Sequence, residues 1–303
     1  MVTWTTAAPS NTFSNATSPS ITASAPAPST AEPAPRRRPR DPRIYQIAML
    51  GSLLAYGVFA LGFDIHPGHA ITALVTALGV QAVLTRWVGL PRFDPKSPLI
   101  SALSLALLLR TDALVVVLLA ATVTVASKFA LRAGGKHIFN PTNFGIAITL
   151  LLVDNAWVSS GQWGSAALLA FALAGLGGLV VRRAERSDVT WAFLAAYACL
   201  LFGRAAWLGD PLAIPLHQLE SGAFLIFAFF MISDPKTTPS SRPGRVLYAV
   251  LVAALAGWIR FGLYEPNELI WALVLMAPTV PLIDRLLPGA TYAWPGGHNP
   301  KES

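Results

Sequence analysis

The chain has 303 residues, of which 54% are hydrophobic and 12% are charged, and its formal net charge is +7. With a mean hydropathy of +0.54 and recurrent apolar stretches of membrane-spanning length, this composition excludes an ordinary soluble domain and predicts an all-α polytopic membrane protein. Lys and Arg lie mostly between the apolar stretches, which suits contact with a lipid bilayer and excludes nucleic acid as a partner. The single cysteine, Cys199, provides no disulfide framework, and we expect no metal site.

The N-terminal segment differs from the rest of the chain. Residues 1 to about 35 consist largely of Ala, Pro, Ser and Thr, which supply too little apolar surface for folding. Five arginines follow directly before the first apolar stretch, where positive charge favours the cytoplasmic side of a membrane: Arg36, Arg37, Arg38, Arg40 and Arg43. We therefore expect a disordered cytoplasmic tail over 1–43, a transmembrane domain over 44–288 and a short cytoplasmic tail over 289–303.

Ten apolar stretches follow one another in the transmembrane domain: 44–63, 69–88, 98–109, 113–131, 141–157, 163–181, 189–208, 221–232, 245–262 and 267–287. Every second loop between them is rich in Lys and Arg, whereas the loops on the opposite side, such as the one around 209–218, are nearly free of both. This alternation predicts a multi-pass membrane protein with an even number of segments and both termini in the cytoplasm.

The third and eighth stretches, 98–109 and 221–232, are short. Each would form a helix of about 18 Å, too short for a hydrocarbon core of about 30 Å. A helix that stops inside a membrane leaves backbone groups that protein or a water-filled cavity must satisfy. The two stretches hold equivalent positions in two halves of five helices. Because five is odd, the second half would be inserted upside down, so we expect two inverted five-helix repeats whose broken helices meet near the midplane.

Ionisable residues follow directly after both short stretches. Arg110 and Asp112 follow the third, and Asp234 and Lys236 follow the eighth. Charged groups at membrane depth pair with one another, face a cavity or line a pathway, so these four residues are candidates for an ion or substrate pathway. The alternative is that both pairs lie at the two membrane interfaces.

A second polar group, in the stretch KHIFNPTNFG (136–145), precedes the fifth apolar stretch. Asn140 and Pro141 have the residue types of a helix start, because Asn caps free N–H groups and Pro lacks one. A cap does not require the other polar residues. A helix N-terminus with a lysine and amide donors can receive a phosphate or carboxylate, so the candidate cofactor-binding residues are Lys136, His137, Asn140, Thr142 and Asn143. The alternative for Lys136 is interfacial anchoring.

Other charged residues have simpler interpretations. Lys128, Arg204 and Arg260 lie near the ends of apolar stretches, and we expect their side chains to reach back to the interface. The chain contains no Gly-rich phosphate loop, no nucleophile elbow and no zinc-protease pattern. The sequence therefore predicts no self-contained enzyme and no catalytic residue.

Three motifs resemble landmarks of the RnfD/NqrB family, the membrane subunits of the Rnf complex and of the sodium-translocating NADH:quinone reductase. They are GGKHIFNPTNFG, FFMISDPKTTP and LIWALVLMAPTVPLID. The matching residues are Phe139, Asn140 and Pro141, then Ser233, Asp234 and Pro235, then Pro281, Leu282, Ile283 and Asp284. The resemblance covers roughly 45–288 and implies ten helices in two inverted repeats. It also implies a subunit that takes part in electron-transport-coupled ion transport, with other Rnf-like subunits as partners.

Members of this family carry FMN esterified to a threonine in an SGAT-like stretch after the fifth helix. Here the stretch reads VSSGQWGSA, and no threonine lies between 150 and 189. The resemblance therefore implies a flavin, FMN or riboflavin, held without a covalent bond, in a non-catalytic or flavin-carrying subunit of an oxidoreductase complex. The short form of the motifs is similar to the divergent enediyne-cluster, UnbU-like branch. For that branch the alternatives are a stand-alone transporter of a small molecule or ion, linked to secondary-metabolite biosynthesis, and a non-catalytic scaffold.

Overall fold

The computed structural model describes residues 41–60, 62, 65–159, 178 and 185–292. The described residues all belong to one compact unit. In its first half the helices are α1 (Pro42–Phe59), α2 (Pro67–Trp87), α3 (Lys96–Leu108), α4 (Leu114–Ala130) and α5 (Pro141–Leu152). The second half contains α7 (Ser187–Leu208), α8 (Ala213–Leu219), α9 (Gly222–Ile226) with the π-helical turn η1 (Phe227–Met231), α10 (Arg242–Trp258) with the π-helical turn η2 (Ile259–Leu263), α11 (Glu268–Met276), the 3-10 turn η3 (Ala277–Thr279) and α12 (Val280–Leu286).

Most helices agree with the predicted apolar stretches where the structure describes the chain. The fifth stretch, 141–157, is an exception, because α5 ends at Leu152 and the end of the stretch forms strand β4 (Ala156–Val158), which pairs with another strand. The sixth stretch, 163–181, lies almost wholly outside the described residues. Within the described residues, four helical segments are long and apolar enough to cross a membrane: Pro67–Trp87, Ser187–Leu208, Arg242–Leu263 and Glu268–Leu286. A fifth is formed if Ala213–Leu219 and Gly222–Met231, which meet at a 52° bend, are one span. The chain is therefore a multi-pass, mostly helical membrane protein. The predicted loop around 209–218 differs from expectation because part of it forms α8.

The starts of the helices follow from local sequence. Asn140 caps α5, since its side-chain oxygen accepts a hydrogen bond from the backbone N–H of Asn143 at 3.0 Å, and Pro141 occupies the first turn. This confirms the predicted start of the fifth helix. Asp41 caps α1 in the same way at 3.0 Å, and Ser241 caps α10 at 3.2 Å. Each cap satisfies an N–H group that the helix itself leaves unpaired.

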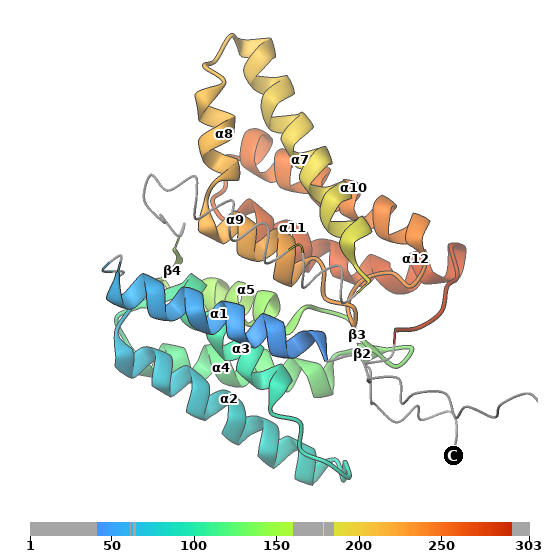
Figure 1. Ribbon diagram of the computed structural model, residues 1–303. Helices are drawn as coiled ribbons and strands as arrows, with labels where there is room; N and C mark the ends of the chain where they lie inside the picture. The colour runs from blue at the N-terminus through green and yellow to red at the C-terminus, as the bar shows by residue number, and fades with distance from the viewer. Residues whose placement is uncertain (1–40, 61, 63–64, 160–177, 179–184, 293–303) are drawn as a thin grey trace, which may run out of the picture. The chain divides into compact units, whose positions relative to one another are not determined.

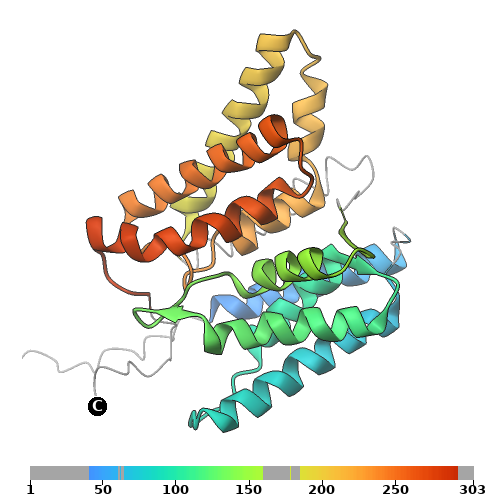
Figure 2. The same ribbon diagram turned by 180° about the vertical axis from the view of Figure 1, so that it is seen from behind.

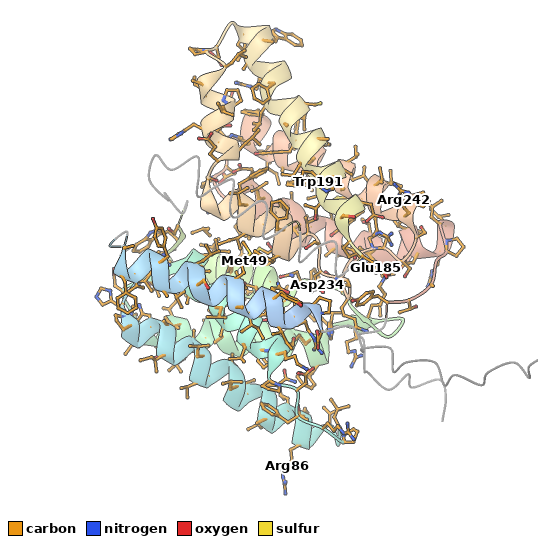
Figure 3. The ribbon with its side chains drawn as sticks, in the orientation of Figure 1. Met49, Arg86, Glu185, Trp191, Asp234 and Arg242 are labelled. Atoms are coloured by element: carbon orange, nitrogen blue, oxygen red, sulfur yellow. The ribbon has the colours of Figure 1, made fainter. Side chains whose placement is uncertain are left out.

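Both short helices end where other segments supply hydrogen bonds. After α3 the chain forms strand β1 (Leu109–Thr111), which pairs antiparallel with β4 (Ala156–Val158). After η1 the carbonyl of Met231 accepts a hydrogen bond from the Asn140 side chain at 3.3 Å. Figure 3 shows Asp234 in the segment that follows η1. The ends of both short helices thus have protein partners, as the membrane environment requires.

The described helices pack as two groups, visible from both sides in Figures 1 and 2. In the first group α3 contacts α1 and α2, and α4 contacts α2 and α5. In the second group α10 contacts α7 and α11. Contacts between α5 and α11 join the groups, and one buried apolar cluster includes residues from both, such as Ile146 and Leu273. The division between the groups falls where the sequence predicts the boundary between two halves.

A close approach of two helices fixes the position of α5. A Cβ atom built on Gly145 would overlap the Oγ1 atom of Thr124 on α4 and would lie 3.0 Å from the carbonyl oxygen of Ala120. Only a glycine permits this spacing, since small residues let membrane helices approach closely. The packing of α4 on α5 also sets the distance between the end of α4 and the start of α5, where the candidate site lies.

Candidate functional site

A cavity of about 250 Å³ lies where the beginnings of α1, α3 and α5, the end of α4 and the segment after η1 come together. We call it the basic cavity, because its lining includes Arg43, Lys128, Arg132, His137 and Lys236, besides the carboxylates Asp94 and Asp234. Asn140 and Thr142 also line it. Three of the five candidate cofactor-binding residues therefore face the same space as two of the four candidate pathway residues.

Asn140 and Asn143 connect the two groups of helices. The side-chain nitrogen of Asn140 donates to the Met231 carbonyl at 3.3 Å and lies 3.4 Å from a carboxylate oxygen of Asp234. The side-chain nitrogen of Asn143 donates to the carbonyl of Ile270 at 3.0 Å. These bonds explain why the helix start contains more amides than a cap requires. Asn143 does not line the basic cavity, so its amide holds α5 against α11.

Lys136 points away from the basic cavity. Its ammonium nitrogen lies 2.8 Å from Oδ2 of Asp284, 2.6 Å from the carbonyl oxygen of Thr238 and 3.0 Å from Oγ of Ser240. Only 8% of its surface is exposed. An ammonium group has three N–H donors, and these three acceptors occupy all of them. Lys136 therefore forms an ion pair with Asp284 that links the two groups of helices.

Lys128, near the end of α4, is the lysine that does line the basic cavity. Only 5% of its surface is exposed, so the expectation that its side chain reaches the interface is wrong. Its Nζ atom lies 3.2 Å from the hydroxyl oxygen of Ser97. A signal for this burial exists in the sequence. Lys128 lies three and seven residues after Val125 and Ala121, which share a helix face with it and are fully buried.

Arg204, in α7, and Arg260, in η2, both have partners within the second half of the chain. Arg260 donates to a carboxylate oxygen of Glu268 at 2.6 Å, and the guanidinium of Arg204 lies 4.3 Å from the ring centre of Phe261. Each of these two side chains therefore has a partner within the protein.

Electrostatics in the basic cavity are dominated by cations. Burial, together with the neighbouring positive charges of Arg132 and Lys128, lowers the pKa of His137 to about 4, so its imidazole is neutral at pH 7. Burial also raises the pKa of Asp234, against the hydrogen bond that its carboxylate accepts from the backbone N–H of Lys236 at 3.0 Å. The main cause of both shifts is the burial of these two side chains, which disfavours their charged forms.

The balance of charge in the cavity follows from the ion pairs. Arg43 is neutralised, since it pairs with Asp41 at 2.8 Å and with Asp94 at 2.5 Å. The other charged residues that the structure describes in the lining are three cations, Lys128, Arg132 and Lys236, and one carboxylate, Asp234. The lining therefore has an excess of two positive charges. The cavity is therefore suited to an anion. Two further polar atoms of the lining, Oε1 of Gln81 and Nδ1 of His137, are buried without a hydrogen-bond partner among the described residues.

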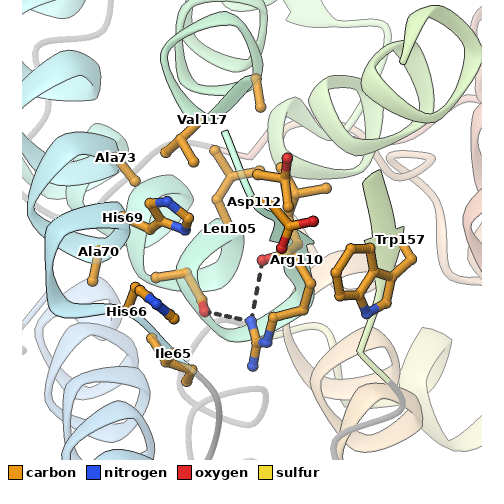
Figure 4. A pocket seen from close by; sticks show the side chains of 14 residues that line it. Ile65, His66, His69, Ala70, Ala73, Leu105, Arg110, Asp112, Val117 and Trp157 are labelled. Carbon is orange, nitrogen blue, oxygen red and sulfur yellow. Dashed lines mark hydrogen bonds between the residues drawn. The ribbon is translucent and has the colours of Figure 1, made fainter. Parts of the chain in front are cut away.

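The other predicted pair, Arg110 and Asp112, lines a different cavity of about 200 Å³ with His66, His69 and Trp157 (Figure 4). The guanidinium of Arg110 donates to the carbonyl oxygens of Ala106 and Leu109 at 2.9 and 3.1 Å, so it satisfies the end of α3. The carboxylate of Asp112 is exposed. The structure thus does not bring the four predicted pathway residues together. It assigns one pair to each of two cavities, which lie at the ends of the two short helices.

Comparisons with known proteins agree with the resemblance of the motifs. Residues 151–293 match the family model described as "NQR2, RnfD, RnfE family". Similar proteins include several that are named as a subunit of an ion-translocating oxidoreductase complex. The one from Alcanivorax borkumensis is 38% identical over 122 residues, which are 39% of this chain and 35% of the relative. Those of Escherichia coli strain K12 and Citrobacter koseri are each 35% identical over 44% of this chain and 33% of the relative.

The match therefore spans about a third of the length of these relatives. It includes the motif at 233–235 and the one at 281–284, whereas the FNP motif at 139–141 precedes the region that the family model covers. The structure nevertheless joins the first motif to the other two, through the Asn140–Met231 hydrogen bond and the Lys136–Asp284 ion pair. Over residues 151–293, somewhat less than half of its length, the chain is similar to the NQR2, RnfD, RnfE family.

Proposed function

We propose that this chain is a membrane subunit of a complex that couples electron transport to the movement of an ion across the bacterial cytoplasmic membrane. The observation that carries the proposal is the family match over 151–293, in a chain with several apolar helices of membrane-spanning length. Its relatives are named as subunits of an ion-translocating oxidoreductase complex. We accordingly propose other Rnf-like subunits as partners, the lipid bilayer as its environment and both termini on the cytoplasmic side.

The proposed architecture is a pair of inverted five-helix repeats. In support, the described helices form two packing groups divided at the predicted boundary, and the third and eighth predicted stretches form the short helices α3 and α9 with η1. Each short helix is followed by a pair of charged residues that lines a cavity, Arg110 with Asp112 and Asp234 with Lys236. Such ends of broken helices are where membrane transporters of inverted-repeat architecture bind their substrates.

We further propose that the basic cavity holds a flavin, FMN or riboflavin, without a covalent bond. The residues present fit such a ligand. The excess of two positive charges suits an anionic group, the unpaired Oε1 of Gln81 can accept a hydrogen bond from a ring N–H, and aromatic side chains such as Phe129 and Phe230 form part of the wall. A flavin would supply one- and two-electron chemistry, and the chain would bind it, orient it and exclude water. The stretch 160–163, where the resemblance of the motifs would place a covalently bound flavin, lies outside the described residues.

The purified chain in lipid nanodiscs tests this proposal. After removal of any co-purified flavin, FMN and riboflavin are titrated and the quenching of flavin fluorescence is measured. We expect saturable binding of one flavin per chain. The matched control is Arg110→Gln, which removes a cation from the other cavity and is expected to bind flavin like the wild type. A protein that contains no flavin after purification and takes up none on titration would contradict the proposed cofactor.

A second candidate function is a stand-alone transporter of an ion or small molecule. The observation that favours it is the presence of a charged cavity at the end of each short helix. In proteoliposomes, Asp234→Asn or Arg110→Gln would then abolish sodium-ion or proton flux while the protein remains folded. Flux like that of the wild type in both variants would argue against a route through these residues.

A further inference from the structure

We propose that the inner part of the basic cavity is a binding site for a phosphate group, anchored by Lys128, with Lys236 and Arg132 nearer to solvent. The three cations line one cavity and differ in exposure, since Lys128 is buried, Lys236 is partly buried and Arg132 is exposed. The inference deepens the proposed function, on which it rests for the identity of the cavity, because it names the chemical group that the site selects.

The first step is the incomplete pairing of Lys128. Transfer of an ammonium ion from water into a protein interior is costly unless acceptors replace the lost water. Lys128 has 5% of its surface exposed, and the acceptor that the structure gives its three donors is the hydroxyl of Ser97 at 3.2 Å. In the described part of the chain no carboxylate lies within ion-pair distance of its Nζ atom. Two donors of a buried cation are therefore available to a ligand.

Lys136 provides a comparison within the same protein, because it is a buried lysine whose three N–H donors all have acceptors. It is buried to nearly the same degree, yet its ammonium has three acceptors within 3.0 Å, one of them the carboxylate of Asp284. The two lysines are eight positions apart in the sequence and have different partners in the structure. The comparison indicates that Lys128 is completed by something other than this chain.

The two carboxylates that line the cavity with Lys128, those of Asp94 and Asp234, interact with other groups. Asp94 forms an ion pair with Arg43 at 2.5 Å. Asp234 accepts the backbone N–H of Lys236 and lies next to the amide of Asn140. The cavity keeps an excess of two positive charges, which a phosphate monoester, with a charge of about −1.5 to −2 at pH 7, would neutralise. A phosphodiester with a single negative charge would neutralise half of it.

The apolar part of the cavity lining indicates the chemistry of the part of the ligand that carries the phosphate. Apolar side chains from four segments form the wall beside the cations: Leu90, Ile100, Phe129, Phe229 and Phe230. An inorganic ion would leave this surface uncovered, so we infer a phosphate carried by an apolar body. Two sources have this chemistry, a soluble phosphate monoester with an aromatic ring and the headgroup of an anionic phospholipid.

The test uses the full chain in nanodiscs of zwitterionic lipid, in wild-type form and as Lys128→Met, Lys128→Arg and Arg86→Gln. Arg86 is an exposed cation at the end of α2 outside the cavity, and its side chain points away from the other helices (Figure 3). It is therefore the matched control. FMN and riboflavin, which differ by one phosphate, are titrated in parallel, with inorganic phosphate as competitor. Lipid retention is measured by native mass spectrometry after transfer through phosphatidylglycerol.

For a soluble monoester we expect the wild type to bind FMN more tightly than riboflavin by roughly ten- to hundredfold, the value of one charge-assisted hydrogen bond. Lys128→Met abolishes this preference and leaves riboflavin affinity unchanged, whereas Lys128→Arg and Arg86→Gln retain it. For a lipid headgroup, the wild type retains one phosphatidylglycerol and Lys128→Met retains none. Either result supports the phosphate site, and the two results distinguish the sources.

Stability provides a readout that does not depend on flavin. Without phosphate or anionic lipid, Lys128→Met is expected to raise the unfolding temperature, because it removes an incompletely paired buried charge. If Lys128→Met instead unfolds the protein, Lys128 is already satisfied within the chain and the inference is wrong. Equal affinities for FMN and riboflavin, without a retained lipid, would also overturn it. If no flavin binds but phosphatidylglycerol is retained through Lys128, the proposed cofactor fails while the phosphate site remains.

Discussion

The ammonium of Lys136 lies 2.8 Å from the carboxylate of Asp284, a residue 148 positions later in the sequence. The other carboxylate oxygen of Asp284 accepts the backbone N–H of Ser240 at 2.7 Å. One ion pair thus holds together the start of α5, the segment after η1 and helix α12. These are the places of the three motifs that resemble the RnfD/NqrB family, so the motifs belong to one connected structural unit.

Removal of one partner of this ion pair should be strongly destabilising. Lys136→Met leaves the partly buried Asp284 carboxylate without its cation, and we expect the free energy of unfolding to fall by at most about 3–5 kcal/mol, the cost for a fully buried pair. We expect the same direction for Asp284→Asn, and a partial recovery in the double variant Lys136→Met/Asp284→Leu, which removes both charges. Chemical unfolding in detergent micelles measures these effects. Unfolding of Lys136→Met at the wild-type midpoint would show that the pair does not stabilise the fold.

The Asn143–Ile270 hydrogen bond gives a second prediction about the joint between the groups of helices. Asn143→Leu removes the donor at 3.0 Å from the Ile270 carbonyl, and we expect a loss of about 1–3 kcal/mol because the bond is buried. The matched control is Asn155→Leu, at an exposed position after α5, which should unfold like the wild type. Equal midpoints for Asn143→Leu and Asn155→Leu would contradict this role of Asn143.

The contact of α4 with α5 predicts opposite effects for two Gly→Ala substitutions. At Gly145 the new methyl group would overlap Thr124, and such overpacking typically costs about 1–3 kcal/mol. At Gly79, within α2, no other atom lies within 4 Å of the built Cβ. There alanine should stabilise the helix by about 0.5–1 kcal/mol. Thermal unfolding in detergent measures both, and a Gly145→Ala variant as stable as Gly79→Ala would exclude the close approach.

The neutral state of His137 predicts how stability depends on pH. Its pKa is about 4 in the folded protein and about 6.5 in an unfolded chain. Between these values the unfolded state binds more protons, so the contribution of His137 is complete above pH 6.5 and is lost as the pH falls towards 4. The total change is about 3 kcal/mol. Asp234 has a raised pKa, so its contribution changes in the opposite direction, equally in wild type and variants.

Unfolding temperatures of the wild type and His137→Phe, measured from pH 4 to pH 7, isolate this contribution. The wild type should lose more stability over this range than His137→Phe. His217→Gln is the control, because the side chain of His217 is 87% exposed, and it should follow the wild type. Parallel profiles for the wild type and His137→Phe would contradict a buried, neutral His137.

The positions of the helices could be predicted from the sequence because hydrophobic length is a local property. Each predicted apolar stretch within the described residues corresponds to a helix, and Asn140 with Pro141 marks the start of α5. The short length of the third and eighth helices could also be predicted from the lengths of their apolar stretches. The inverted relation of the two halves, the number of crossings and the terminal tails stay predictions.

The site was less predictable, because its residues are defined by partners distant in the sequence. Lys136 and Lys128 are both lysines next to an apolar stretch, and nothing local shows that Asp284 neutralises Lys136 while Asp94 is paired with Arg43. Helical periodicity places Lys128 on the buried face of α4, but not in a cavity. In the same way, Arg110 and Asp234 follow similar helices and line different cavities.

The central claim, that the chain serves electron-transport-coupled ion movement, is tested most directly in inside-out membrane vesicles. Vesicles from the source organism, from a strain lacking this chain and from the complemented strain are given NADH, and uptake of sodium ions and protons is followed. The account predicts that NADH-driven uptake of one of these ions falls in the deletion strain and returns with the wild-type chain. Unchanged uptake of both ions in the deletion strain would contradict it.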